Sequence, residues 1–64
     1  MTVTEVQAKY VFEKLGKGQI VEAVDFRRKQ YISLGEKTVA TVQKLVDEAT
    51  TNATVKFYQI EEGA

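Results

Sequence analysis

Apolar residues recur at helical spacing between Ser33 and Ala49, with charged residues between them. At about 100° per residue the apolar side chains fall on one side of a helix and the charged ones on the other. Ser33 and Glu36 form an S-x-x-E capping box, and Thr38 is the alternative N-cap. The segment is therefore predicted to be an amphipathic helix, with an apolar stripe made of Val39, Val42, Leu45, Val46 and Ala49.

The segment from Val6 to Lys14 alternates between two sets of side chains, which is the period of a β-strand. A helical alternative begins with the capping-box pair Thr4 and Gln7. On a helical wheel, however, the apolar residues of this segment spread around most of the circumference, which does not suit a half-buried helix. The strand is the preferred interpretation.

Residues 16–18, Gly-Lys-Gly, favour a tight turn because glycine readily adopts positive φ. The following residues, 19–32, are rich in β-branched and aromatic side chains and are predicted to form the second strand of a hairpin. A helix over residues 19–32 remains an alternative, because several of their apolar side chains share one arc.

The register of this hairpin is open. A two-residue turn pairs Phe12 with Val21, whereas a three-residue turn pairs Tyr10 with Val24. The longer turn is preferred, because it also sets a lysine opposite an aspartate and keeps the large apolar residues together.

Residues 53–60, ATVKFYQI, alternate again and predict a last strand with apolar side chains on both faces. The resulting order is β-β-α-β. We expect an α+β fold in which a three-stranded antiparallel sheet, the N-terminal hairpin plus the C-terminal strand, packs on one amphipathic helix. No linker or repeat divides the chain, so residues 1–64 are expected to form a single small domain.

The 64 residues include no cysteine and no histidine. This composition argues against a disulfide, a structural zinc site or haem ligation, and we expect no metal and no cofactor. The only serine, Ser33, is explained by the helix cap, and the paired acids are typical of solvated charge. We therefore expect no catalytic residues and no enzymatic activity.

The N-terminal residues have neither a basic segment nor an apolar core of the kind that marks a signal peptide. No apolar run approaches the roughly 20 residues that a membrane helix needs. A cytoplasmic location without membrane contact is expected.

Nine basic and nine acidic residues give a formal net charge of zero. The charges are uneven along the chain, with a basic middle and an acidic end. The basic-aromatic stretch 26–31 could contact phosphates and stack on bases. Weak nucleic-acid binding is accordingly the alternative function, with contacts expected from Arg27, Arg28, Lys29 and Tyr31.

One helix can cover only one face of the expected sheet, which leaves apolar side chains on the other face. A domain of this size buries only about 60% of its unfolded surface and often relies on self-association for stability. We therefore expect a non-enzymatic interaction or assembly module that forms a homo-oligomer or binds a protein partner, as an accessory protein or minor subunit of a larger bacterial or phage assembly. The residues expected at its interface are Val11, Val21, Ala23, Tyr31, Tyr58 and Ile60.

Overall fold

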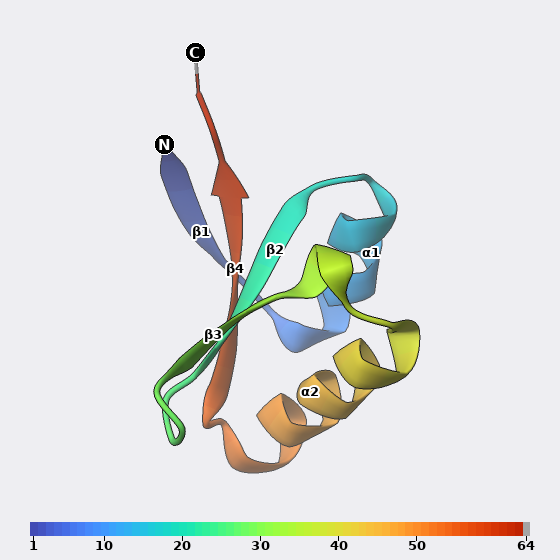
Figure 1. Cartoon of the computed structure of the whole chain (residues 1–64), viewed down its shortest axis with the longest axis vertical. Helices are drawn as coiled ribbons and strands as arrows, with labels where there is room; N and C mark the ends of the chain where they lie inside the picture. The colour runs from blue at the N-terminus through green and yellow to red at the C-terminus, as the bar shows by residue number, and fades with distance from the viewer. Residues whose placement is uncertain (64) are drawn as a thin grey trace.

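Residues 1–63 fold into a four-stranded antiparallel sheet with their helices on one side (Figure 1). The structure is a computed structural model and describes residues 1–63. The strands are β1 (Thr2–Val6), β2 (Ile20–Asp25), β3 (Gln30–Ser33) and β4 (Val55–Glu61). The helices are α1 (Val11–Gly16) and α2 (Val39–Asn52), and single 3-10 turns, η1 (Ala8–Tyr10) and η2 (Leu34–Glu36), precede them.

The strand order is β1-β4-β2-β3, and every pair of neighbours is antiparallel. The last strand, β4, therefore lies inside the sheet and pairs with both β1 and β2. At its centre Phe57 lies opposite Val6 on one side and Ala23 on the other. Strands that are distant in sequence are joined through this one element.

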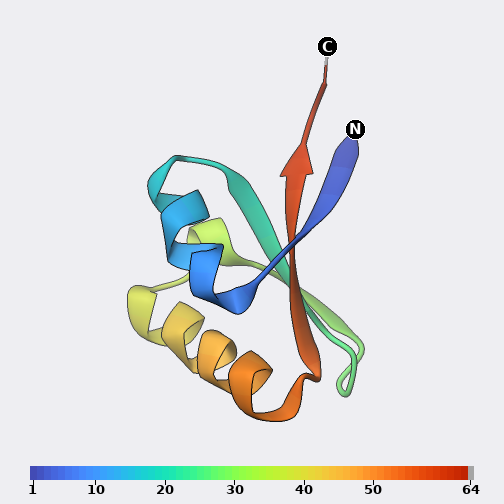
Figure 2. The same ribbon diagram turned by 180° about the vertical axis from the view of Figure 1, so that it is seen from behind.

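The helices form a second layer over one face of the sheet, as the front and back views agree (Figures 1 and 2). Alternate residues of β2 and β4 point into the space between the layers, so the burial pattern of both strands has period two. Fully burying a side chain such as that of Phe57 contributes about 1.5–3 kcal/mol. The core consists of Val6, Val11, Val21, Ala23, Leu34, Val42, Leu45, Val55 and Phe57.

The expected α+β class and the antiparallel sheet are confirmed, but the sheet has four strands rather than three and the helical layer contains a second α-helix. The expected amphipathic helix is present as α2, which begins at Val39 rather than near Ser33. Thr38 is the N-cap, since its Oγ1 accepts a hydrogen bond of 3.3 Å from the backbone N–H of Thr41. The capping box at Ser33 is wrong, because Ser33 ends β3 and its side chain makes no cap hydrogen bond.

The expected strand from Val6 to Lys14 is wrong. The strand β1 ends at Val6, and residues 8–16 are helical. Val11 is completely buried, whereas Tyr10 and Phe12, on either side of it, are exposed. Because these exposed aromatic residues count as apolar on a helical wheel, the apolar positions spread around its circumference. The short buried face of the helix is therefore not recognisable from the pattern.

Residues 19–32 form two strands, β2 and β3, joined by a turn at residues 26–29. The expected hairpin across residues 16–18 is wrong, because that segment connects α1 to β2. Val24 pairs with Lys56 and Tyr31 rather than with Tyr10. Gly18 is nevertheless favoured in this connection, because its φ of 78° is a conformation that glycine adopts readily.

The expected C-terminal strand is present as β4. It has apolar side chains on both faces, as predicted: Phe57 points into the core, and Tyr58 points to the opposite face. Its position was not predicted, because the order of strands in a sheet depends on pairing between distant segments rather than on local pattern.

The connection from α2 to β4 contains a non-glycine residue in the left-handed region. Ala53, the C-cap of α2, has φ 55° and ψ 22°, and its N–H donates to the carbonyl of Ala49 over 3.1 Å. This conformation costs an L-amino acid about 1–2 kcal/mol, and glycine adopts it freely.

We predict that Ala53→Gly raises the free energy of unfolding by about 0.5–1 kcal/mol, measured by urea denaturation. Lys44→Gly is the matched control, because this exposed position lies inside α2, where glycine should lower stability by about 1 kcal/mol. Equal destabilisation by both substitutions would contradict the role assigned to Ala53.

Candidate functional site

The face of the sheet that points away from the helices is left uncovered by residues 1–63 (Figure 1). Its residues follow from the strand registers, because directly paired residues project to the same side of a sheet. They form three rows across the strands. The apolar row is Val3, Ile20 and Ile60; the acidic row is Glu5, Glu22, Ser33 and Tyr58; the lysine row is Val24, Tyr31 and Lys56. Together these residues are called the open face.

Apolar and aromatic side chains make up most of the open face, and three of them are strongly exposed. The exposed fractions are 54% for Val3, 49% for Ile20 and 78% for Tyr31. Its three charged side chains, Glu5, Glu22 and Lys56, take part in neither of the ion pairs that the structure contains within residues 1–63. The open face thus combines solvent-exposed apolar side chains with charged side chains that form no ion pair within residues 1–63.

The structure divides the expected interface residues between the two faces of the sheet. Tyr31, Tyr58 and Ile60 lie on the open face, as their assignment to an interface requires. Val11, Val21 and Ala23 are 0% exposed. These three belong to the core, and no partner can contact them in this fold. Val11 lies in α1 rather than in a strand, and the turn at residues 26–29 places Tyr31 on the face opposite to Val21 and Ala23.

Sequence reasoning missed Val3, Ile20 and the three charges of the open face. Residues 1–4 show no strong preference in the sequence, although residues 2–6 form the strand β1. Ile20 and Val21 lie on opposite faces of β2, and only the position of the helices (Figure 1) shows that the face of Ile20 is the uncovered one. Alternation separates the two faces of a strand and does not say which of them a helix will cover.

The three consecutive cations lie in the turn between β2 and β3, and not on a strand as expected. Asp25, which is buried, ends β2, and its Oδ1 accepts hydrogen bonds of 3.0 Å from the backbone N–H groups of Arg27 and Arg28. The Nε of Arg28 lies 3.9 Å from Oδ2 of the same carboxylate. Lys29 completes the turn with φ 54°. A single carboxylate therefore fixes the backbone that displays the cations.

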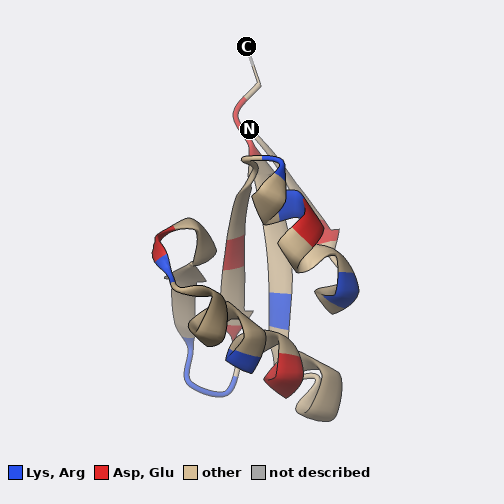
Figure 3. Cartoon of the chain, turned by 90° about the vertical axis from the view of Figure 1, so that its right-hand side faces the viewer, with Lys and Arg blue, Asp and Glu red and all other residues tan. Residues whose placement is uncertain are grey.

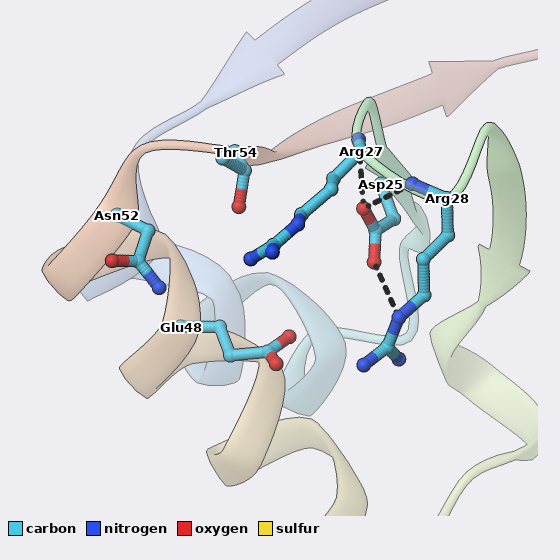
Figure 4. A pocket seen from close by; sticks show the side chains of 6 residues that line it. All are labelled: Asp25, Arg27, Arg28, Glu48, Asn52 and Thr54. Atoms are coloured by element: carbon cyan, nitrogen blue, oxygen red, sulfur yellow. Dashed lines mark hydrogen bonds and ion pairs between the residues drawn. The ribbon is translucent and has the colours of Figure 1, made fainter.

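A polar cavity of about 310 Å³ opens between this turn and the C-terminal part of α2 (Figure 4). The Arg27 side chain extends across it toward α2, where Glu48 and Asn52 project, and Thr54 lies on the β4 side. Two guanidinium groups face two carboxylates, those of Asp25 and Glu48, so the lining is balanced in formal charge.

A second hollow, of about 360 Å³, lies between β3 and α2 and is called the basic groove. Arg28, Lys37 and Lys44 contribute cations to it, and Glu48 is its only carboxylate. Figure 3 shows the blue hairpin turn beside the helical layer on this side of the molecule. The fold thus brings two lysines from the α2 region to the cations of the turn. Its full lining is Arg28, Gln30, Ile32, Lys37, Thr41, Lys44, Leu45 and Glu48.

The polar side-chain groups available are carboxylates, amines, guanidinium groups, amides and hydroxyls, since histidine and cysteine are absent from the sequence. Within residues 1–63, carboxylates do not gather into a group of three that could hold a metal ion. Across the same residues, none of the helices combines the length and the apolar character that crossing a membrane requires. These groups can bind charged and polar partners through ion pairs and hydrogen bonds.

Comparison with known proteins gives no relative: no family model, curated protein sequence or solved structure matches the chain. The function proposed below therefore rests on the surfaces described above.

We predict that Asp25→Ala lowers the free energy of unfolding by about 1–3 kcal/mol, because two backbone N–H groups of the turn lose their acceptor. Asp25→Asn is the matched control, since its side-chain oxygen can still accept both hydrogen bonds. Urea denaturation of the two variants measures the difference. A loss of stability as large for asparagine as for alanine would contradict the capping role.

Proposed function

We propose that this protein is a non-enzymatic interaction and assembly module, and that the open face is its binding surface. The observation that carries the proposal is the uncovered face of the four-stranded sheet, on which Val3, Ile20 and Tyr31 are about half exposed or more. Contiguous apolar patches larger than a few hundred Å² mark interaction sites on soluble proteins.

The size of the domain supports the same proposal. The helices cover one face only, so the chain has a single apolar layer to stabilise it, and a domain of about 60 residues is marginally stable. Burying the open face adds a second apolar layer, as in a sandwich of two sheets. The sequence contains neither a disulfide nor a histidine or cysteine ligand that could supply this stability instead.

A second copy of the chain is the partner we propose. A face-to-face pair with two-fold symmetry buries the same apolar residues on both subunits and is the commonest form of homo-oligomer. Each subunit then serves as the missing layer of the other.

We predict that Ile20→Lys weakens self-association at least about tenfold, because the ammonium group must be desolvated inside the interface. Val39→Lys is the matched control: Val39 is 72% exposed, but it lies on α2, away from the open face. Sedimentation velocity over a series of protein concentrations measures the dissociation constants, and circular dichroism verifies that both variants fold.

A wild-type chain that stays monomeric at every concentration would contradict the proposal. Equal weakening by Ile20→Lys and Val39→Lys would show that association does not use the open face.

Nucleic-acid binding is the second candidate, and the basic groove is the observation that favours it. Arg28, Lys37 and Lys44 lie around one hollow beside the other cations of the hairpin turn. Tyr31, on the neighbouring strand β3, is exposed but projects to the open face, so the basic groove offers contacts to phosphates and no stacking by Tyr31. A cluster of this kind would bind a phosphate backbone with strong dependence on salt.

If the basic groove binds nucleic acid, Lys37→Ala/Lys44→Ala should lower the affinity for a single-stranded oligonucleotide at least about tenfold at low salt and reduce its salt dependence. Lys9→Ala/Lys14→Ala, at and within the first helical segment, changes the net charge equally and is the control. Fluorescence anisotropy with a labelled oligonucleotide measures the affinity. No binding by the wild-type chain at low salt would exclude this function.

A further inference from the structure

The three charges of the open face restrict how two copies can stack. Within one chain, Glu5 and Glu22 lie on either side of Tyr58 in the acidic row, because both residues are paired with Tyr58 in the sheet. Lys56 lies on the same strand as Tyr58 and two residues away, about 7 Å along β4. The open face therefore carries a pair of carboxylates and, one row along, a single ammonium group.

If the strands of the two stacked sheets stay aligned, the two-fold axis of the pair runs either along the strands or across them. If the axis runs parallel to the strands, each row of one subunit lies over the same row of its partner. The carboxylates of the two acidic rows are then brought together. If the axis runs across the strands between the acidic and lysine rows, the acidic row of each subunit lies over the lysine row of its partner. Buried like charges are strongly unfavourable, whereas buried opposite charges can compensate each other.

We infer that the open face binds a second copy of this chain about a two-fold axis that crosses β4 near Phe57 and runs perpendicular to the strands. This inference rests on the proposed function and specifies its geometry. Lys56 of each subunit then lies over Tyr58 of its partner and between the partner's two glutamates. The gap between packed sheets, about 10 Å, is within the combined reach of a lysine and a glutamate side chain.

The apolar ends of the face support the same arrangement. Phe26 follows β2, and its N–H donates to the carbonyl of Thr54 over 2.9 Å, which places it one row beyond the lysine row. The proposed axis brings this row over the apolar row of the partner, so that Phe26 meets Ile20. Both side chains are about half exposed in the single chain. The arrangement thus buries apolar side chains of both subunits on either side of the charged rows.

Charge exchange between subunits tests this geometry. In Lys56→Glu, each new glutamate faces the partner's carboxylates, and in Glu5→Lys/Glu22→Lys each Lys56 faces two lysines. Each variant alone should associate at least about tenfold more weakly than the wild type. An equimolar mixture of the two should recover association, since both sets of contacts in the mixed pair then join opposite charges.

The experiment is sedimentation velocity of each variant and of the mixture, with circular dichroism as a test of folding. Lys44→Glu is the control, because Lys44 lies on α2: it should associate like the wild type, and mixing it with Glu5→Lys/Glu22→Lys should restore nothing.

The outcomes separate the geometry from the function on which it rests. Association of the wild type combined with recovery in the mixture supports the inferred axis. A wild type that associates, with variants that weaken it and a mixture that does not recover, overturns the axis and leaves the open face as the interface. A monomeric wild type overturns both.

Discussion

The pairing of β4 with both β1 and β2 is the interaction on which this structure depends. Without β4, the N-terminal strand has no neighbour, and the sheet is reduced to the short β2-β3 hairpin. The same strand presents Phe57 to the helical layer and Tyr58 to the opposite side. β4 therefore contributes to both the core and the open face, so the candidate binding surface depends on the same strand as the fold.

The elements with a sustained pattern were predictable from the sequence. The helix α2 and the strand β4 both contain several periods of their characteristic spacing, so the α+β class could be stated correctly. The helical segment after β1 could not, because α1 has only six residues and exposed aromatic residues lie on both sides of its inward-facing Val11. In such short segments tertiary burial, rather than local periodicity, decides the conformation.

The candidate surface was predictable in kind and only partly in detail. That one layer of helices leaves apolar residues of a sheet uncovered follows from composition and pattern alone. Tyr31, Tyr58 and Ile60 were assigned to this surface from the sequence, whereas Val21 and Ala23 occupy the covered face. The difference arises from the turn at residues 26–29, which divides the expected strand in two, so that Tyr31 shares a face with Val24 rather than with Val21 and Ala23.

The central position of β4 also has a consequence for biosynthesis. The ribosome synthesises β1 first and β4 last. During translation β1 therefore has no partner strand, and one edge of β2 is unpaired. Contacts between segments so far apart in sequence form slowly, because loop closure must precede them. Until β4 has left the exit tunnel, the nascent chain exposes strands without their partner, and the sheet is completed only after β4 has been translated.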